Sequence, residues 1–138
     1  MTSPYLTLTE RLIVLDDETD KRVQQFPNIE RHRLAASMRE ASREMHRTSI
    51  IAWKRKQKSS TLFDLDVQVE LFRRDVRKAY RKEYINEGGL KHWMQMVNDV
   101  GRSVGGWIKH EVKTEQAERA RKLEESRKAR GFKETVVR

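Results

Sequence analysis

Residues 62–80 decide the fold of this chain, and they read LFDLDVQVELFRRDVRKAY. Apolar residues recur in this stretch at spacings of three and four, which place them on one face of an α-helix. The predicted buried stripe consists of Leu62, Leu65, Val69, Phe72, Val76 and Tyr80. Basic side chains lie opposite this stripe, so the stretch predicts an amphipathic helix with a cationic outer face.

Three further segments show the same spacing, at roughly residues 7–25, 29–56 and 90–112, and sustained strand alternation is absent. We expect Pro27 to end the first helix, Ser60 or Thr61 to cap the third, and Gly88 and Gly89 to separate the third from the fourth. Short connections favour antiparallel neighbours. The predicted fold class is therefore all-α, an antiparallel up-down-up-down four-helix bundle with a charged, partly helical C-terminal tail.

The apolar stripe of the fourth helix ends at Val112. Residues 113–138 contain nine basic and five acidic residues but few large apolar side chains to offset the entropy of ordering. We therefore expect residues 1–112 to form the four-helix bundle. Residues 113–138 are expected to be a charged C-terminal extension, either a frayed helix or disordered.

The composition excludes several classes of protein. The 138 residues include no cysteine, which rules out disulfide scaffolds, thiolate metal sites, Cys-ligated iron–sulfur clusters and Cys nucleophiles. No stretch approaches the roughly 20 apolar residues of a membrane span, and the N-terminal segment carries acidic residues where a signal peptide is apolar. We expect a cytoplasmic protein with no membrane partner.

The net charge of +9 points to a polyanionic partner, and nucleic acid is the leading candidate. Residues 29–60 alone contain nine basic and three acidic residues, a net +6. At 100° per residue, the cations of the second and third helices form two outward ridges suited to phosphate contacts; a merely solvated face is the alternative. The candidate RNA-binding residues are Arg39, Arg43, Arg47, Lys54, Lys58, Arg74, Arg77, Lys78, Arg81 and Lys82.

The stretch VGRSVGGWIKH, residues 100–110, places three glycines inside an amphipathic helix. Each interior glycine costs about 1 kcal/mol relative to alanine, so close approach of another helix or backbone is the expected reason. A phosphate-binding loop is a poor alternative, because the Walker spacing and a preceding strand are missing. The candidate residues for oligomer contact or helix packing are Gly101, Gly105, Gly106 and Trp107.

Features of an enzyme are missing from the sequence. The four histidines show no HExxH motif and no i,i+4 pair, and surface positions account for them better than a metal site. Asp16 and Asp20 share one helical face, but a lone carboxylate pair provides neither an activated water nor a base in a pocket. We therefore predict no catalytic residues, no metal and no cofactor.

Three features together resemble the accessory variability proteins of diversity-generating retroelements, a four-helix-bundle family similar in fold to the bundle proteins encoded by ribosomal intervening sequences. The first is Phe26-Pro27 followed by Arg31, Arg33 and Leu34, and the second is the stretch VQVELFRRDVRKAY at residues 67–80. The third and most specific is VGRSVGGWIK, which is similar to the family's closing Gly-Arg-x-x-Gly-Gly-Trp pattern.

This resemblance implies a non-catalytic accessory subunit that forms a homo-oligomer, a pentamer in the family. Its implied partners are a reverse transcriptase, the template RNA and the cDNA copied from it, and its implied role is to support mutagenic cDNA synthesis. The long charged tail departs from the family pattern. The alternative is a structural or adaptor bundle, similar to the intervening-sequence proteins, with a protein or ribosomal partner.

Overall fold

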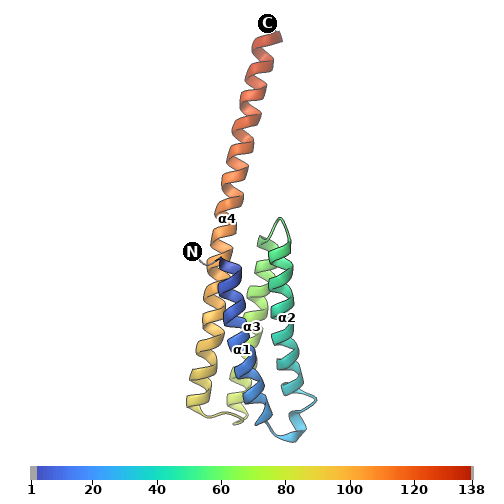
Figure 1. Ribbon diagram of the computed structural model, residues 1–138, viewed down its shortest axis with the longest axis vertical. Coiled ribbons are helices and arrows are strands. Elements are labelled where there is room, and N and C mark those ends of the chain that lie inside the picture. Colours follow the sequence, from blue (N-terminus) through green and yellow to red (C-terminus); the bar gives the residue numbers. More distant parts are fainter. Residues whose placement is uncertain (1–2, 138) are drawn as a thin grey trace. The chain divides into compact units, whose positions relative to one another are not determined.

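A computed structural model describes residues 3–137 of the chain, and the side chains of residues 3–131. Within this part the chain is 88% helical and contains four α-helices and no strands, which confirms the predicted all-α four-helix bundle (Figure 1). The elements are α1 (Pro4–Gln24), the 3₁₀-helix η1 (Asn28–Glu30), α2 (Leu34–Lys54), α3 (Ser59–Arg81) and α4 (Glu87–Val137). Contacts divide the chain into two units, Met1–Ile108 and Lys109–Arg138.

Within the first unit, hydrogen bonds between helices establish the antiparallel order. Gln68 on α3 donates a hydrogen bond to Thr48 on α2 (2.9 Å). The Trp93 indole N–H on α4 donates to the Thr19 hydroxyl on α1 (3.1 Å), and Arg73 on α3 donates to Asn98 on α4 (2.9 Å). The first part of α4 therefore lies against both α1 and α3 (Figure 1).

The core of this unit consists of the predicted apolar stripes. In α3 the side chains of Leu62, Leu65, Val69, Phe72 and Val76 are fully buried, as the sequence predicts. Tyr80 is an exception, because it is 40% exposed and Ala79 takes the buried position instead. Three aromatic rings pack together in this core, because Phe26 and Phe72 both lie against Trp93.

The starts of α1 and α2 differ from the sequence prediction. Helix α1 starts at Pro4 rather than Thr7, because the Ser3 hydroxyl accepts the Leu6 N–H (3.1 Å) and proline suits the first turn. Pro27 does follow the end of α1 closely, as expected. Helix α2 starts at Leu34 rather than Ile29 because η1 and a non-helical Arg33 precede it.

Glu30 is the residue that sets the start of α2. Its buried carboxylate accepts hydrogen bonds from the Leu34 backbone N–H (3.1 Å) and from the Tyr84 hydroxyl (3.2 Å). Burial, together with this carboxylate, raises the pKa of Tyr84. One carboxylate thus satisfies an orphan donor of α2 and joins it to the segment after α3.

The prediction that Ser60 or Thr61 caps α3 is wrong. Helix α3 begins at Ser59, and the side chain of its N-cap residue, Lys58, forms no capping hydrogen bond. The Thr61 hydroxyl is buried and accepts a hydrogen bond from Arg55 instead (2.9 Å). The connection is therefore organised around the end of α2 rather than around the start of α3.

The glycines between α3 and α4 also do not act as predicted. The left-handed residue of this connection is Glu83 (φ 63°), whereas Gly88 and Gly89 lie in the first turn of α4. Asn86 caps that turn by accepting the Gly89 N–H (2.8 Å). A Cβ at Gly89 would lie 2.8 Å from the Arg22 guanidinium, so close packing of α4 on α1 explains this glycine.

In the second unit, residues 109–131 are helical and nearly all of their side chains are exposed or partly exposed. Leu123 is 64% exposed, and Arg127 lies 3.8 Å from Glu124 as an i,i+3 ion pair. None of the helices in the described residues is long and apolar enough to cross a membrane.

Candidate nucleic-acid interface

The predicted cationic ridge on α2 lies on its outer face, but its arginines differ in how firmly they are held. Arg39 pairs with Asp20 on α1 (3.0 Å), and Arg47 lies 3.8 Å from Glu44 on its own helix. Arg43 is exposed and forms no ion pair with any side chain between residues 3 and 131. Arg43 is therefore the ridge arginine most available to a phosphate.

The two lysines at the end of α2 have contacts that the sequence did not reveal. The Lys54 ammonium lies over the Trp53 ring, 4.4 Å from its centroid. The Lys58 ammonium donates to the backbone carbonyls of Ala52 (2.9 Å), Trp53 (2.8 Å) and Arg55. Lys58 thus satisfies the orphan carbonyls at the C-terminus of α2, which makes it a capping residue.

The ridge on α3 is organised around one acidic residue. Arg73 lies 3.0 Å from Glu70, and Arg74 and Arg77 each lie 3.9 Å from the same carboxylate. One carboxylate cannot neutralise three guanidinium groups, so a net positive charge remains. Lys78, Arg81 and Lys82 continue this ridge without an ion pair to any described side chain.

Asp75 lies within the α3 ridge. Burial raises the pKa of its carboxyl, and the nearby Lys78 ammonium opposes that rise. The carboxylate is thus held in an unfavourable environment when it is ionised.

The register of α2 and α3 brings the two ridges to the same level of the bundle. Since Thr48 bonds to Gln68 and the helices are antiparallel, Arg43 is level with Arg73, and Arg39 is level with Arg77. Arg39, Arg43 and the predicted cations from Arg74 to Lys82 therefore occupy the half of the bundle near the connection between α1 and α2. Arg47 lies just past the middle of α2, and Lys54 and Lys58 lie at its other end, so the register does not bring them to this group.

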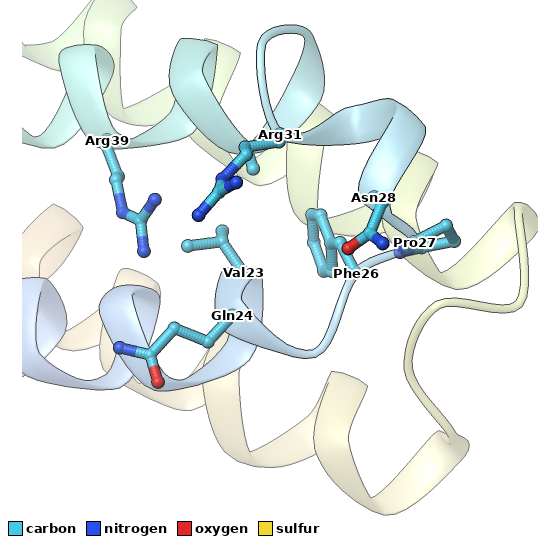
Figure 2. Close-up of a pocket in the computed structure, with 8 residues that line it drawn as sticks. Val23, Gln24, Phe26, Pro27, Asn28, Arg31 and Arg39 are labelled. Atoms are coloured by element: carbon cyan, nitrogen blue, oxygen red, sulfur yellow. The ribbon is translucent and has the colours of Figure 1, made fainter.

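A hollow of about 210 Å³ lies at this end, between the end of α1 and the start of α2. It is lined by Val23, Gln24, Phe26, Pro27, Asn28, Arg31, Ala35 and Arg39. Figure 2 shows the Arg31 and Arg39 guanidinium groups directed toward the α1 residues Val23 and Gln24. Arg39 and Gln24 both bond to the Asp20 carboxylate (3.0 and 3.2 Å), so Arg31 is the guanidinium of this hollow that is left without an ion pair among the described side chains. Sequence reasoning missed Arg31 here, because only the α1–α2 corner brings it to Arg39.

The outer face of α3 carries a second feature that the sequence analysis did not identify. Phe63, Val67 and Leu71 follow one another at i, i+4 and i+8, and they are 52%, 60% and 56% exposed. They share the outward face with Arg74 and Lys78, so the outer face of α3 has an apolar half followed by a basic half. The same i, i+4 spacing in the printed sequence is the signal that would have revealed them.

The glycine and tryptophan motif of α4 plays two different parts. Gly101 leaves space for the Arg73 guanidinium, because an added Cβ at this position would clash with it. Nothing lies within 4 Å of a Cβ added at Gly105 or Gly106. Trp107 is buried and packs edge-on against Tyr5 of α1, with 6.0 Å between ring centroids. Helix packing within the first unit therefore accounts for Gly101 and Trp107.

Residues 8–111 match the bAvd-like family. The chain belongs to this family, the accessory variability proteins of diversity-generating retroelements. No curated protein and no solved structure matched the chain. The bAvd-like family is an accessory rather than a catalytic family.

The region that matches the bAvd-like family contains both ridges, the hollow beside Arg39 and the motif from Gly101 to Trp107. Asp16 and Asp20, the carboxylate pair considered from the sequence, bond to α2 through Ser42 (2.7 Å) and Arg39. No group of three or more His, Asp or Glu side chains in the described residues is arranged to hold a metal ion.

Proposed function

We propose that this bAvd-like chain is a cytoplasmic, non-catalytic accessory subunit that binds a reverse transcriptase and its template RNA and supports mutagenic cDNA synthesis. Family membership suggests the association with a reverse transcriptase. The observation that carries the RNA part is the gathering of two cationic ridges in one half of the bundle. The cDNA copied from that RNA presents the same phosphates and is a second ligand for these faces.

Binding through the ridges is expected to be driven by phosphate charge, because cations on outward helix faces release counterions from any RNA alike. Arg43, Arg81 and Lys82 supply charges that form no ion pair with any described side chain. Arg31, at the hollow beside the start of α2, adds one further exposed cation at this end of the bundle.

We also propose a homo-oligomer, a pentamer by family resemblance. A row of three large side chains that are half exposed is unusual on a monomer and favours a protein contact. Phe63, Val67 and Leu71 form such a row in the first unit. We place the contact with a second copy on this apolar half of α3, separate from the basic half.

Co-expression with the reverse transcriptase and template RNA of one retroelement tests the proposal. We expect the three components to co-purify at moderate salt, and the two proteins to remain associated after nuclease treatment. The double variant Arg43→Glu/Arg74→Glu should lose the RNA but keep the reverse transcriptase. Lys21→Glu/Lys91→Glu changes the charge equally outside the ridges and serves as the matched control.

Recovery of the chain with neither RNA nor reverse transcriptase would contradict the proposal. Recovery with ribosomal proteins would instead support the adaptor function that the intervening-sequence resemblance allows. Equal loss of RNA by the ridge variant and by its control would remove the ridges as the binding surface.

A further inference from the structure

Trp53, at the end of α2, is the exposed tryptophan of the described chain, and its environment is not that of a core residue. It is 47% exposed, whereas Trp93 is fully buried and Trp107 is 3% exposed. The Tyr5 ring on α1 stacks against it with 4.5 Å between centroids and 4° between planes. The Trp53 ring is thus held parallel to a neighbour on one face.

The other face of the Trp53 ring carries the Lys54 ammonium. A parallel ring at 4.5 Å leaves no space for an ammonium between the two rings, so the Lys54 ammonium at 4.4 Å lies over the opposite face. An exposed cation–π contact of this kind is worth about 0.5–1 kcal/mol and is readily exchanged for a better partner. This face of Trp53 is therefore an accessible aromatic surface.

The stacked pair of Trp53 and Tyr5 is held rigid because it is supported from within the bundle. Tyr5 packs edge-on against the buried Trp107, with centroids 6.0 Å apart and planes at 61°. The Lys58 ammonium ties the backbone carbonyls of Ala52 and Trp53 to the following connection. Stacking on a ring that is already fixed loses little conformational entropy.

The charge around Trp53 indicates the class of ligand. No acidic residue occurs between Glu44 and Asp64, whereas the cations in this interval are Arg47, Lys54, Arg55, Lys56 and Lys58. An aromatic surface in a cationic setting is the arrangement by which proteins hold single-stranded nucleic acid, with bases on the ring and phosphates on the cations. Bases within a duplex already have both faces stacked, so the ligand must be unpaired.

We propose that Trp53 is a stacking platform for an unpaired base of single-stranded RNA, with Lys54 moving from the ring to a neighbouring phosphate when the base binds. This inference rests on the proposed RNA-binding function and adds a requirement for an unpaired base, which the ridges do not recognise. The ridges follow phosphates in any RNA, whereas Trp53 selects strands with an accessible base.

The test compares an oligoadenylate with an abasic RNA backbone of the same length, since both carry the same phosphates. Oligoadenylate should quench part of the tryptophan emission, and that loss reports on Trp53 because a bound base cannot reach the other two tryptophans, which are buried. Trp53→Leu should weaken binding of oligoadenylate by about 5- to 150-fold and leave abasic binding unchanged. Trp53→Phe should restore much of the difference.

Ile13→Ala is the matched control, because Ile13 on α1 is similarly exposed, 50%, but has no aromatic ring. It should alter neither affinity. Circular dichroism melts establish that each variant is folded, and the comparison of the two ligands on the unmodified protein needs no variant.

The outcomes separate this inference from the function on which it rests. If both ligands bind the unmodified protein equally, and without quenching, the stacking platform is refuted while RNA binding stands. If neither ligand binds, both ideas fail. If Trp53→Leu reduces both affinities equally, or weakens only the association with a protein partner, the platform is also refuted.

Discussion

Arg43 and Arg73 allow a matched test of the phosphate-binding ridges, since they lie at the same level on neighbouring helices. Arg43 is exposed and forms no ion pair with a described side chain. The Arg73 side chain is 22% exposed, and it bonds to Glu70 and to Asn98 on α4. Arg43→Gln and Arg73→Gln remove the same charge from two very different environments.

The expected magnitude follows from counterion release. Each phosphate contact with a single strand contributes about 0.7 to the slope of log K against log salt. Arg43→Gln should therefore lower the slope by about 0.7, and the ratio of wild-type to variant affinity should shrink about 2.6-fold between roughly 50 and 200 mM salt. Charge reversal at Arg39, Arg43 and Arg47 together should lower the slope by about 2 or more.

Fluorescence anisotropy with several unrelated RNAs across a salt series measures these slopes. Arg73→Gln should leave the slope unchanged and lower the melting temperature instead, because its contacts join α3 to α4. A flat dependence on salt would refute phosphate-driven binding. A slope change for Arg73→Gln but not for Arg43→Gln would show that the ridge has been assigned to the wrong side chains.

Four further predictions concern stability and assembly. Gly106→Ala should raise the free energy of unfolding, measured by thermal melts, by up to about 1 kcal/mol, because nothing lies within 4 Å of the added Cβ. Gly101→Ala should raise the free energy of unfolding by less, because the added Cβ displaces the Arg73 guanidinium. Asp75→Asn should stabilise the protein at pH 7, and the gain should shrink as the pH becomes acidic. The pKa of Asp75 is raised in the folded state, so the wild-type protein loses stability as the pH rises above the ordinary aspartate pKa and this carboxyl ionises. Melts at several pH values measure the difference. Val67→Glu should reduce the mass in light scattering toward the 16.4 kDa of a single chain, and an unchanged larger mass would place the contact between copies elsewhere. Removal of residues 114–138 should lower the melting temperature by less than about 5 °C; a larger loss would mean that the tail packs on the bundle.

The apolar spacing of residues 62–80 and of the three other segments was sufficient to predict the four helices and most of the core, because burial of a 3.6-residue stripe is a local property of the sequence. The ends of the helices were predicted less well, since their caps come from elsewhere. Glu30 reaches the start of α2 from η1, and Lys58 reaches back to the end of α2 from the connection. Neither contact follows a standard capping pattern.

The candidate interface was predictable only in that helical periodicity shows which cationic side chains face away from the core. The α2 ridge faces outward as the helical angles require, but the Asp20 partner of Arg39 depends on how α1 packs against α2. Trp53 lies beside the buried stripe of α2 rather than opposite it, so periodicity does not decide its exposure. Its role depends on Tyr5, which is distant in the sequence.

The division of the outer face of α3 into an apolar and a basic half has a consequence for the order of assembly. Val67 and Lys78 are eleven residues apart, or about 16 Å along the helix, beyond the range at which substitutions normally interact energetically. A contact between copies at one half and a phosphate contact at the other are thus thermodynamically separable. Rising salt weakens the proposed phosphate contact and strengthens apolar burial at the proposed contact between copies. The same helix could therefore release a nucleic acid while the protein assembly remains intact.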